Sequence, residues 1–244
     1  MTGSSLVKIA CICICLVSLS LLFLSAYQYL LTSPYIKLEQ VVVTGVDEKT
    51  KRELLKISKL NLNLSLLAIN IDKLKQRMEM HPWVKSIELE KRFPHTLIIR
   101  VEKEVPWAVT TLPELYYMNR AGDIFKEVGF SEEIDYPVIT GISTKGNEMA
   151  GQLKSAAHVL DILESEKGAW SRKAISEIHF RDEGGLALYF RSLPVVIVTR
   201  CSDINIKISE LKKVVEHLQK TGRIYMVKMI NLNYRDGVVV SFKG

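Results

Sequence analysis

The segment from His81 to Ala108 limits the possible folds of this chain more than any other segment. Pro82 ends the helical pattern before it, because proline cannot continue a helix beyond its first turn. Apolar and charged residues then alternate up to Arg92-Phe93-Pro94-His95, a turn in which proline fixes φ. Alternation resumes from Leu97 to Val101, as in a strand with one buried face. The block therefore predicts a helix end followed by a β-hairpin.

A strand and two helices are predicted before this hairpin. The run Leu38–Gly45 is rich in β-branched residues and ends at a turn glycine. Asp47 is placed to cap one helix, and Asn70 is placed to cap a second, Ile71–Met80. With the hairpin, the predicted order of elements is β-α-α-β-β.

Three motifs around the hairpin resemble the second half of a POTRA domain of the type found in the bacterial division family FtsQ/DivIB. They are Pro82-Trp83-Val84, Arg92-Phe93-Pro94-His95-Thr96-Leu97 and Glu104-Val105-Pro106-Trp107-Ala108. Their spacing makes the resemblance specific, although Phe93 replaces the family's usual tryptophan. The resemblance implies a POTRA domain at residues 36–103, with two helices over one face of a three-stranded sheet.

From Glu104 the pattern changes to short strands, turns and two longer helices. The helices are expected at about Glu148–Glu166 and from a cap at Asp203 to Lys220, and the last two strands at Tyr225–Tyr234 and Val238–Phe242. An apolar stripe on the second helix is expected to face the core. Its members are Ile206, Ile208, Leu211, Val214, Val215 and Leu218.

Landmarks of the same family recur in order along this region. They are Gly122 with Phe125, Tyr136–Gly141 and Ile230–Val240, in which Asn231 and Asn233 replace the family's Asp and Arg. The resemblance implies a β domain at residues 104–244. The expected fold class is α+β: one transmembrane helix, a POTRA domain, and a mixed α/β domain with a mostly antiparallel sheet.

Residues 9–31 carry no charge and precede the folded region. At about 1.5 Å per residue this run crosses a bilayer core of about 30 Å. It is longer than the apolar part of a cleaved signal peptide, and no cleavage pattern follows it. We therefore predict a signal anchor at 9–31, a short cytoplasmic tail at 1–8 and the bulk of the chain outside the cytoplasm. Cys201, the one cysteine beyond the anchor, is expected to be buried, with a reactive thiol as the alternative.

The sequence carries no recognisable catalytic or metal-binding motif. The histidines, His81, His95, His158, His179 and His217, show no ligand spacing. His81 and His95, and the acidic pairs Glu132-Glu133 and Asp182-Glu183, are expected to be solvated turn residues. The net charge is +6, but the basic residues do not cluster with aromatic residues, so nucleic-acid binding is not indicated. We expect no enzymatic activity, no metal, no cofactor and no small-molecule substrate.

Two tryptophans, Trp83 and Trp107, admit two interpretations. Tryptophan is enriched among residues that dominate protein interfaces, so either side chain is a candidate partner contact. Each also lies where an aromatic residue would pack an α/β core. We expect core or domain-junction packing.

The family resemblance implies a specific role. FtsQ-like proteins are non-enzymatic scaffolds of the division assembly in the inner (plasma) membrane at the septum. They capture the small bitopic coiled-coil proteins FtsB and FtsL and link early and late division proteins, so other membrane proteins of the division assembly are also implied as partners. The alternative is a membrane-tethered, exported cell-wall enzyme or a receptor for cell-wall material. An outer-membrane assembly factor is related by fold alone, and would have tandem POTRA domains.

The last predicted strand is the candidate partner site. Arg235-Asp236-Gly237 suits a tight turn before it, and a strand at a sheet edge exposes main-chain groups that accept an extended partner. The resemblance implies the same region for FtsB. The candidate residues are Tyr234, Arg235, Gly237, Val238, Val239, Val240, Ser241 and Phe242. The alternative is an internal or covered strand, with Tyr234 simply packed.

Overall fold

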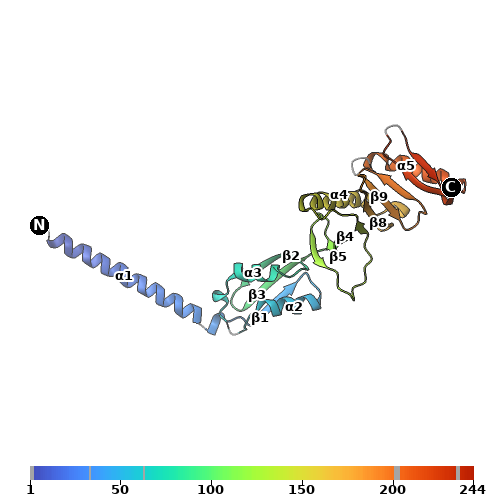
Figure 1. Ribbon diagram of the computed structural model, residues 1–244. Coiled ribbons are helices and arrows are strands. Elements are labelled where there is room, and N and C mark those ends of the chain that lie inside the picture. Colours follow the sequence, from blue (N-terminus) through green and yellow to red (C-terminus); the bar gives the residue numbers. More distant parts are fainter. Residues whose placement is uncertain (1–2, 33, 63, 201–203, 235–236) are drawn as a thin grey trace. The chain divides into compact units, whose positions relative to one another are not determined.

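A computed structural model describes residues 3–32, 34–62, 64–200, 204–234 and 237–244 (Figure 1). The chain divides into two compact units, residues 1–103 and 104–244. Each unit has its own core and is described by itself. The predicted α+β fold class is confirmed.

The predicted anchor lies in one continuous helix, α1 (Gly3–Thr32). Its stretch Cys11–Tyr29 is long and apolar enough to cross a membrane, and it is the one such helix among the described residues. Its side chains from 11 to 29 are exposed, as expected of a helix whose solvent is lipid. A short 3-10 helix, η1 (Pro34–Ile36), follows it.

The rest of the first unit has the predicted β-α-α-β-β order. Its elements are β1 (Gln40–Thr44), α2 (Glu48–Ser58), η2 (Leu66–Ala68), α3 (Ile71–Glu79), β2 (Val84–Arg92) and β3 (Thr96–Lys103). The sheet order is β1-β3-β2, with β1 parallel to β3 and β2 antiparallel to it. Leu97 and Ile99 of the central strand pack with Leu54 of α2 and Met78 of α3 in one buried core. The helices therefore cover one face of the sheet.

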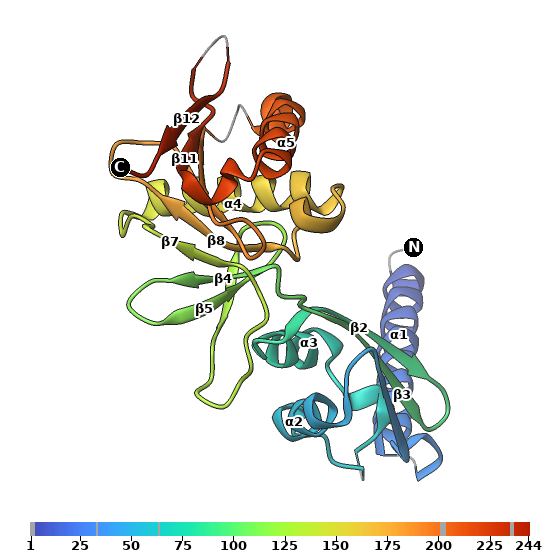
Figure 2. The same cartoon turned by 90° about the vertical axis from the view of Figure 1, so that its right-hand side faces the viewer.

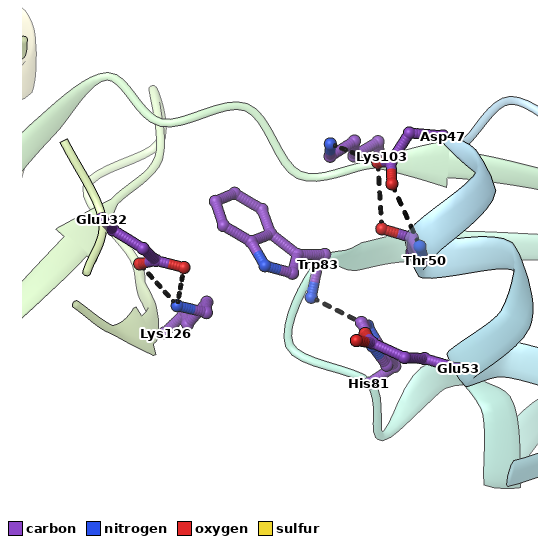
Figure 3. Close-up of polar contacts among 8 residues, drawn as sticks. All are labelled: Asp47, Thr50, Glu53, His81, Trp83, Lys103, Lys126 and Glu132. Atoms are coloured by element: carbon purple, nitrogen blue, oxygen red, sulfur yellow. Dashed lines mark hydrogen bonds and ion pairs between the residues drawn. The ribbon is translucent and has the colours of Figure 1, made fainter. Parts of the chain in front are cut away.

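Side-chain caps fix where the two helices of this unit begin. The Asp47 carboxylate accepts the Thr50 N–H at 3.0 Å and the Thr50 hydroxyl at 3.0 Å, and Lys103 Nζ lies 3.0 Å from it (Figure 3). The Asn70 side chain accepts the Lys73 N–H at 3.0 Å. The bonds from the Thr50 and Lys73 N–H groups each satisfy a backbone donor that a helix start leaves unpaired. Both predicted caps are confirmed.

We expect Asp47→Ala to lower the free energy of unfolding of this unit by about 1 kcal/mol at neutral pH. Asp47→Asn should cost less, because asparagine also caps helices. The Thr50 N–H and then Lys103 hold the pKa of Asp47 well below its usual 3.8. A lowered pKa stabilises the folded state above the unfolded pKa, and this contribution is lost as pH falls below about 4. Urea unfolding at pH 7 and pH 3 measures it; an equal effect of Asp47→Ala at both values would contradict the assignment.

The second unit is built on a nine-stranded sheet in the order β12-β11-β10-β9-β8-β7-β4-β5-β6. Its strands are β4 (Ala108–Thr111), β5 (Leu115–Met118), β6 (Ile124–Glu127), β7 (Val138–Thr140), β8 (Ile175–Phe180), β9 (Leu186–Phe190), β10 (Val196–Thr199), β11 (Val227–Asn231) and β12 (Val239–Phe242). Its helices are α4 (Gly146–Glu164), η3 (Gly168–Trp170), α5 (Ile204–Lys220) and η4 (Arg223–Met226). Most neighbouring strands are antiparallel, as predicted; the parallel pairs are β4–β7, β7–β8 and β10–β11.

One row of apolar side chains crosses six neighbouring strands in register. The paired members are Ile139, Ile178, Leu188, Ile197, Ile230 and Val240. The first five are fully buried, and Val240 packs against the same core, which also contains Leu160 of α4 and Leu211 of α5. Since side chains alternate along a strand, this row fixes which face of every strand the helices cover.

The stripe predicted on α5 is wrong at one position. Ile208, Leu211, Val215 and Leu218 are buried, whereas the Ile206 side chain is 78% exposed. At about 100° per residue, Ile206 lies about 200° around the helix from Ile208 and therefore faces solvent. The expected cap Asp203 and the expected buried Cys201 lie outside the described residues.

His81 is not the solvated turn residue that the sequence indicated. Its side chain is buried, its Nε2 lies 3.0 Å from Glu53 Oε2, and its Nδ1 accepts the Trp83 N–H at 3.3 Å (Figure 3). Nε2 therefore donates to the carboxylate. Burial of the ring is tolerated because both nitrogens have partners.

The two tryptophans differ in their burial. Trp107 belongs to the buried core of the second unit, and the Arg172 guanidinium lies 4.0 Å from its ring centroid. Trp83 is half-buried and outside the buried core cluster of its unit, with Lys103 Nζ 5.2 Å from its ring centroid. Core packing is therefore confirmed for Trp107 and not for Trp83.

Candidate partner-binding edge

The last strand of the chain, β12, lies at an edge of the nine-stranded sheet. Among the described strands it pairs with β11 alone, in antiparallel register, with Val240 opposite Ile230 and Val239 opposite Asn231. Figure 2 shows β11 and β12 as a hairpin at one end of this unit, next to α5. Tyr225, predicted in the preceding strand, lies in η4, and Tyr234 lies beyond the end of β11. The predicted strand Tyr225–Tyr234 was therefore too long at both ends.

Two main-chain bonds show which groups of β12 point away from the sheet. The Leu232 N–H donates to Val198 O toward β10, so Asn231 faces β12 by alternation. The Lys243 N–H donates to Met226 O, on the side of β11. By the same alternation Val239 directs its N–H toward β11. Val240 and Phe242 direct theirs outward, where no strand of the described chain pairs with them.

The side chains of the candidate site divide between two environments. Val238 and Val240 are half-buried and pack against the core. Val239, Phe242 and Tyr234 are exposed. Gly237 and Ser241 are half-buried, while Arg235 lies outside the described residues. The edge thus combines open main-chain groups with three exposed apolar or aromatic side chains.

Contacts from α5 and η4 hold this hairpin, and no sequence pattern indicated them. Lys207 Nζ donates to Leu232 O at 2.8 Å and also to Tyr234 O, which ties the start of the turn to α5. The Arg223 guanidinium lies 4.8 Å from the Phe242 ring centroid. Lys207 and Arg223 are two among many basic residues, and no local pattern marks them.

A groove of about 370 Å³ lies on the other face of the same sheet. It is lined by His179, Arg181, Asp182, Glu183, Ala187, Tyr189, Val196, Val198, Lys228 and Met229. Beside it, the Thr140 hydroxyl lies 2.7 Å from His179 Nδ1 and donates to Glu177 Oε1 at 2.5 Å. A nucleophile activated by histidine needs the acid on the far ring nitrogen. Here the carboxylate binds the hydroxyl itself, so the arrangement does not match that chemistry.

No metal cluster supplements these groups in the described ranges. No three residues of the metal-binding types His, Cys, Asp and Glu come close enough there to hold an ion. Among the described residues, β12 combines main-chain groups that have no neighbouring strand with exposed apolar side chains.

Comparison with known families covers nearly all of the chain beyond its first helix. A model described as "POTRA domain, FtsQ-type" matches residues 36–103, and one described as "FtsQ/DivIB, C-terminal related" matches residues 107–241. The chain belongs to the FtsQ/DivIB family. The C-terminal match extends into β12, so the hairpin is part of the family domain.

Two FtsQ relatives align with this chain along most of their length. Cell division protein FtsQ of Syntrophotalea carbinolica is 28% identical over 220 residues, which cover 88% of this chain and 77% of that protein. FtsQ of Geotalea daltonii is 26% identical over 218 residues, covering 88% and 78%. Cell division protein DivIB of Solibacillus silvestris is 29% identical over 106 residues, covering 43% and 37%. This FtsQ/DivIB chain is a cell division protein.

Proposed function

We propose that this protein is a non-enzymatic scaffold of the division assembly that captures FtsB- and FtsL-type bitopic partners through β12. The observation that carries the proposal is the sheet edge itself. The outward N–H and C=O groups of Val240 and Phe242 have no neighbouring strand among the described residues. Exposed main-chain groups of this kind accept an extended peptide as an additional strand.

The composition of the edge favours partner binding over protection. Soluble proteins commonly block sheet edges with charged side chains, proline or a bulge that twists the strand away. The strand Val239–Phe242 contains neither a charge nor a proline, and its register irregularity lies opposite, in β11. Exposed Tyr234, Val239 and Phe242 supply apolar area beside the main chain.

Phe242→Pro and Phe242→Ala test this proposal as a pair. Both remove the aromatic ring, and only proline also removes an outward donor. Neither touches the donors that hold β12 to β11. With the full chain and a soluble coiled-coil segment of the FtsB-type partner, capture by Phe242→Pro should be about fivefold to tenfold weaker than capture by Phe242→Ala.

Calorimetry measures the two affinities, and unchanged melting of both variants serves as the control. Equal affinities of Phe242→Pro and Phe242→Ala would show that the partner does not pair with the edge of β12. Val239→Pro is the contrasting variant, because its inward N–H faces β11. It is expected to loosen the hairpin itself and so to lower stability as well as capture.

We further propose that α1 crosses the inner membrane once, with residues 1–8 in the cytoplasm and the two folded units outside. Its support is the apolar stretch Cys11–Tyr29 and the single charge, Lys8, on its amino side. A fluorescent reporter that matures only in the cytoplasm should stay dark when fused after Gly244. A fluorescent fusion that is inserted in the membrane would place the two folded units in the cytoplasm and contradict this topology.

A further inference from the structure

The segment of residues 128–137 joins β6, at the edge opposite β12, to the internal strand β7. Its most prominent feature is Phe130, whose side chain is fully exposed. Ile134, four residues on, is also exposed. A single exposed apolar residue needs no explanation by itself, so the question is whether the segment is built to present this one.

The half-buried carboxylate of Glu132 organises the segment that carries Phe130. Glu132 accepts the Gly129 N–H at 3.0 Å and binds Lys126 Nζ through both oxygens, at 2.9 and 2.8 Å (Figure 3). Lys126, and to a lesser degree the Gly129 N–H, lower the pKa of Glu132. Glu132 is thus not the solvated turn residue expected from sequence. It closes a tight loop whose tip is Phe130.

Aromatic rings support the base of this loop. Tyr117 of β5 stacks on Phe125 with ring centroids 6.0 Å apart and meets Tyr136 edge-on at 6.1 Å. Lys126 Nζ lies 5.4 Å from the Tyr117 ring centroid. The loop is therefore fixed at both ends, which lowers the entropy lost when its tip enters a partner.

The charge around Phe130 selects the kind of partner. Residues 127–135 contain four acidic and no basic side chains. Glu132 is paired with Lys126 and Asp135 with Arg191. Glu127 and Glu133 are exposed and form no ion pair within the described part of the chain. These two carboxylates lie three residues before and three residues after Phe130 in the sequence, and Glu133 also lines a cavity with Arg172, Lys173 and Arg191. Negative charge on both sides of Phe130 opposes binding to an anionic lipid surface and favours basic groups.

We propose that the 128–137 loop is a second docking site, at which Phe130 enters an apolar pocket of a protein rimmed by Lys or Arg. Eight strand spacings of about 4.8 Å separate β6 from β12, so the two edges lie roughly 38 Å apart along the sheet. A single strand added at β12 therefore does not cover this loop. This second site stands whether or not β12 captures a partner.

The test places the photo-crosslinking residue p-benzoylphenylalanine at position 130 of the full chain in its native host. We expect an adduct with another protein. Glu127→Lys combined with Glu133→Lys should reduce its yield several-fold at unchanged melting temperature, because the charge that attracts the basic rim is reversed. Phe242→Pro should leave the yield unchanged. Glu132→Gln, which weakens the loop without changing its tip, should also reduce it.

The same probe at Phe93, an exposed phenylalanine in the first unit, serves as the matched control. Four results would overturn the proposal: a yield no higher than at position 93, an adduct only with lipid, an adduct only within the same chain, or insensitivity to charge reversal. Loss of the adduct with Phe242→Pro would assign the loop to the β12 partner instead of to a separate site.

Discussion

Gly45→Ala should destabilise the first unit by more than about 3 kcal/mol and lower its unfolding temperature by roughly 12 °C or more. Gly45 follows β1 with a φ of +92°, a conformation that costs strain in any residue with a Cβ. A Cβ placed there would lie 1.9 Å from the carbonyl oxygen of Val101 in β3. Because that oxygen belongs to the backbone of the central strand, it cannot move aside without disturbing the sheet.

Gly184→Ala separates the two causes. Its φ of +83° resembles that of Gly45, and no atom lies within 4 Å of the Cβ position. It should therefore cost only the conformational strain, about 1 kcal/mol. Denaturant unfolding followed by hydrogen exchange, resolved by peptide, measures both units in one chain. If Gly45→Ala costs no more than Gly184→Ala, close contact with Val101 is not what requires glycine.

Leu160→Ala should destabilise the second unit by about 2–5 kcal/mol and leave the first unit unchanged. Leu160 lies on α4, is fully buried, and belongs to a core that shares no residue with the core of the first unit. Truncation leaves a cavity that the surrounding row of strand side chains fills only in part.

The matched control for this change is Ile206→Ala on α5. The exposed Ile206 side chain should contribute less than about 0.5 kcal/mol, although its sequence context suggested a core position. Protection of peptides from residues 36–103 should be identical in both variants. Loss of protection there on Leu160→Ala would show that the two units unfold together.

Local signals account for the parts of the fold that the sequence predicted. Helix caps such as Asp47 and Asn70 act within three residues, and strand alternation acts over a few residues more. The β12 hairpin was predicted for the same reason, from a turn and two apolar runs. Its place at an edge required the order of all nine strands, which depends on long-range pairing that no short motif encodes.

Two features that the sequence did not indicate depend on residues that are distant in the chain. His81 was expected in solvent because it precedes a proline, but its partner Glu53 is 28 residues earlier in the chain. Lys207 of α5 donates to the carbonyl oxygen of Tyr234, whereas only the apolar side of this helix was apparent from the sequence. The positions of His81 and Lys207 required knowledge of which elements become neighbours. Ile206 has a local cause, because residues two apart on a helix, such as Ile206 and Ile208, lie on different faces.

The β12 strand has four residues and, within the part of the chain that the structure describes, one neighbouring strand, so it has few bonds to break before it separates from the sheet. Opening of such a hairpin costs less free energy than unfolding of the domain, and its amides should exchange with solvent ahead of those in β8 or β9. A partner strand would turn β12 from an edge strand into an internal one. Binding would then slow amide exchange in β11 and β12 alone, so the occupancy of this edge in a living assembly becomes measurable as a local change in solvent protection.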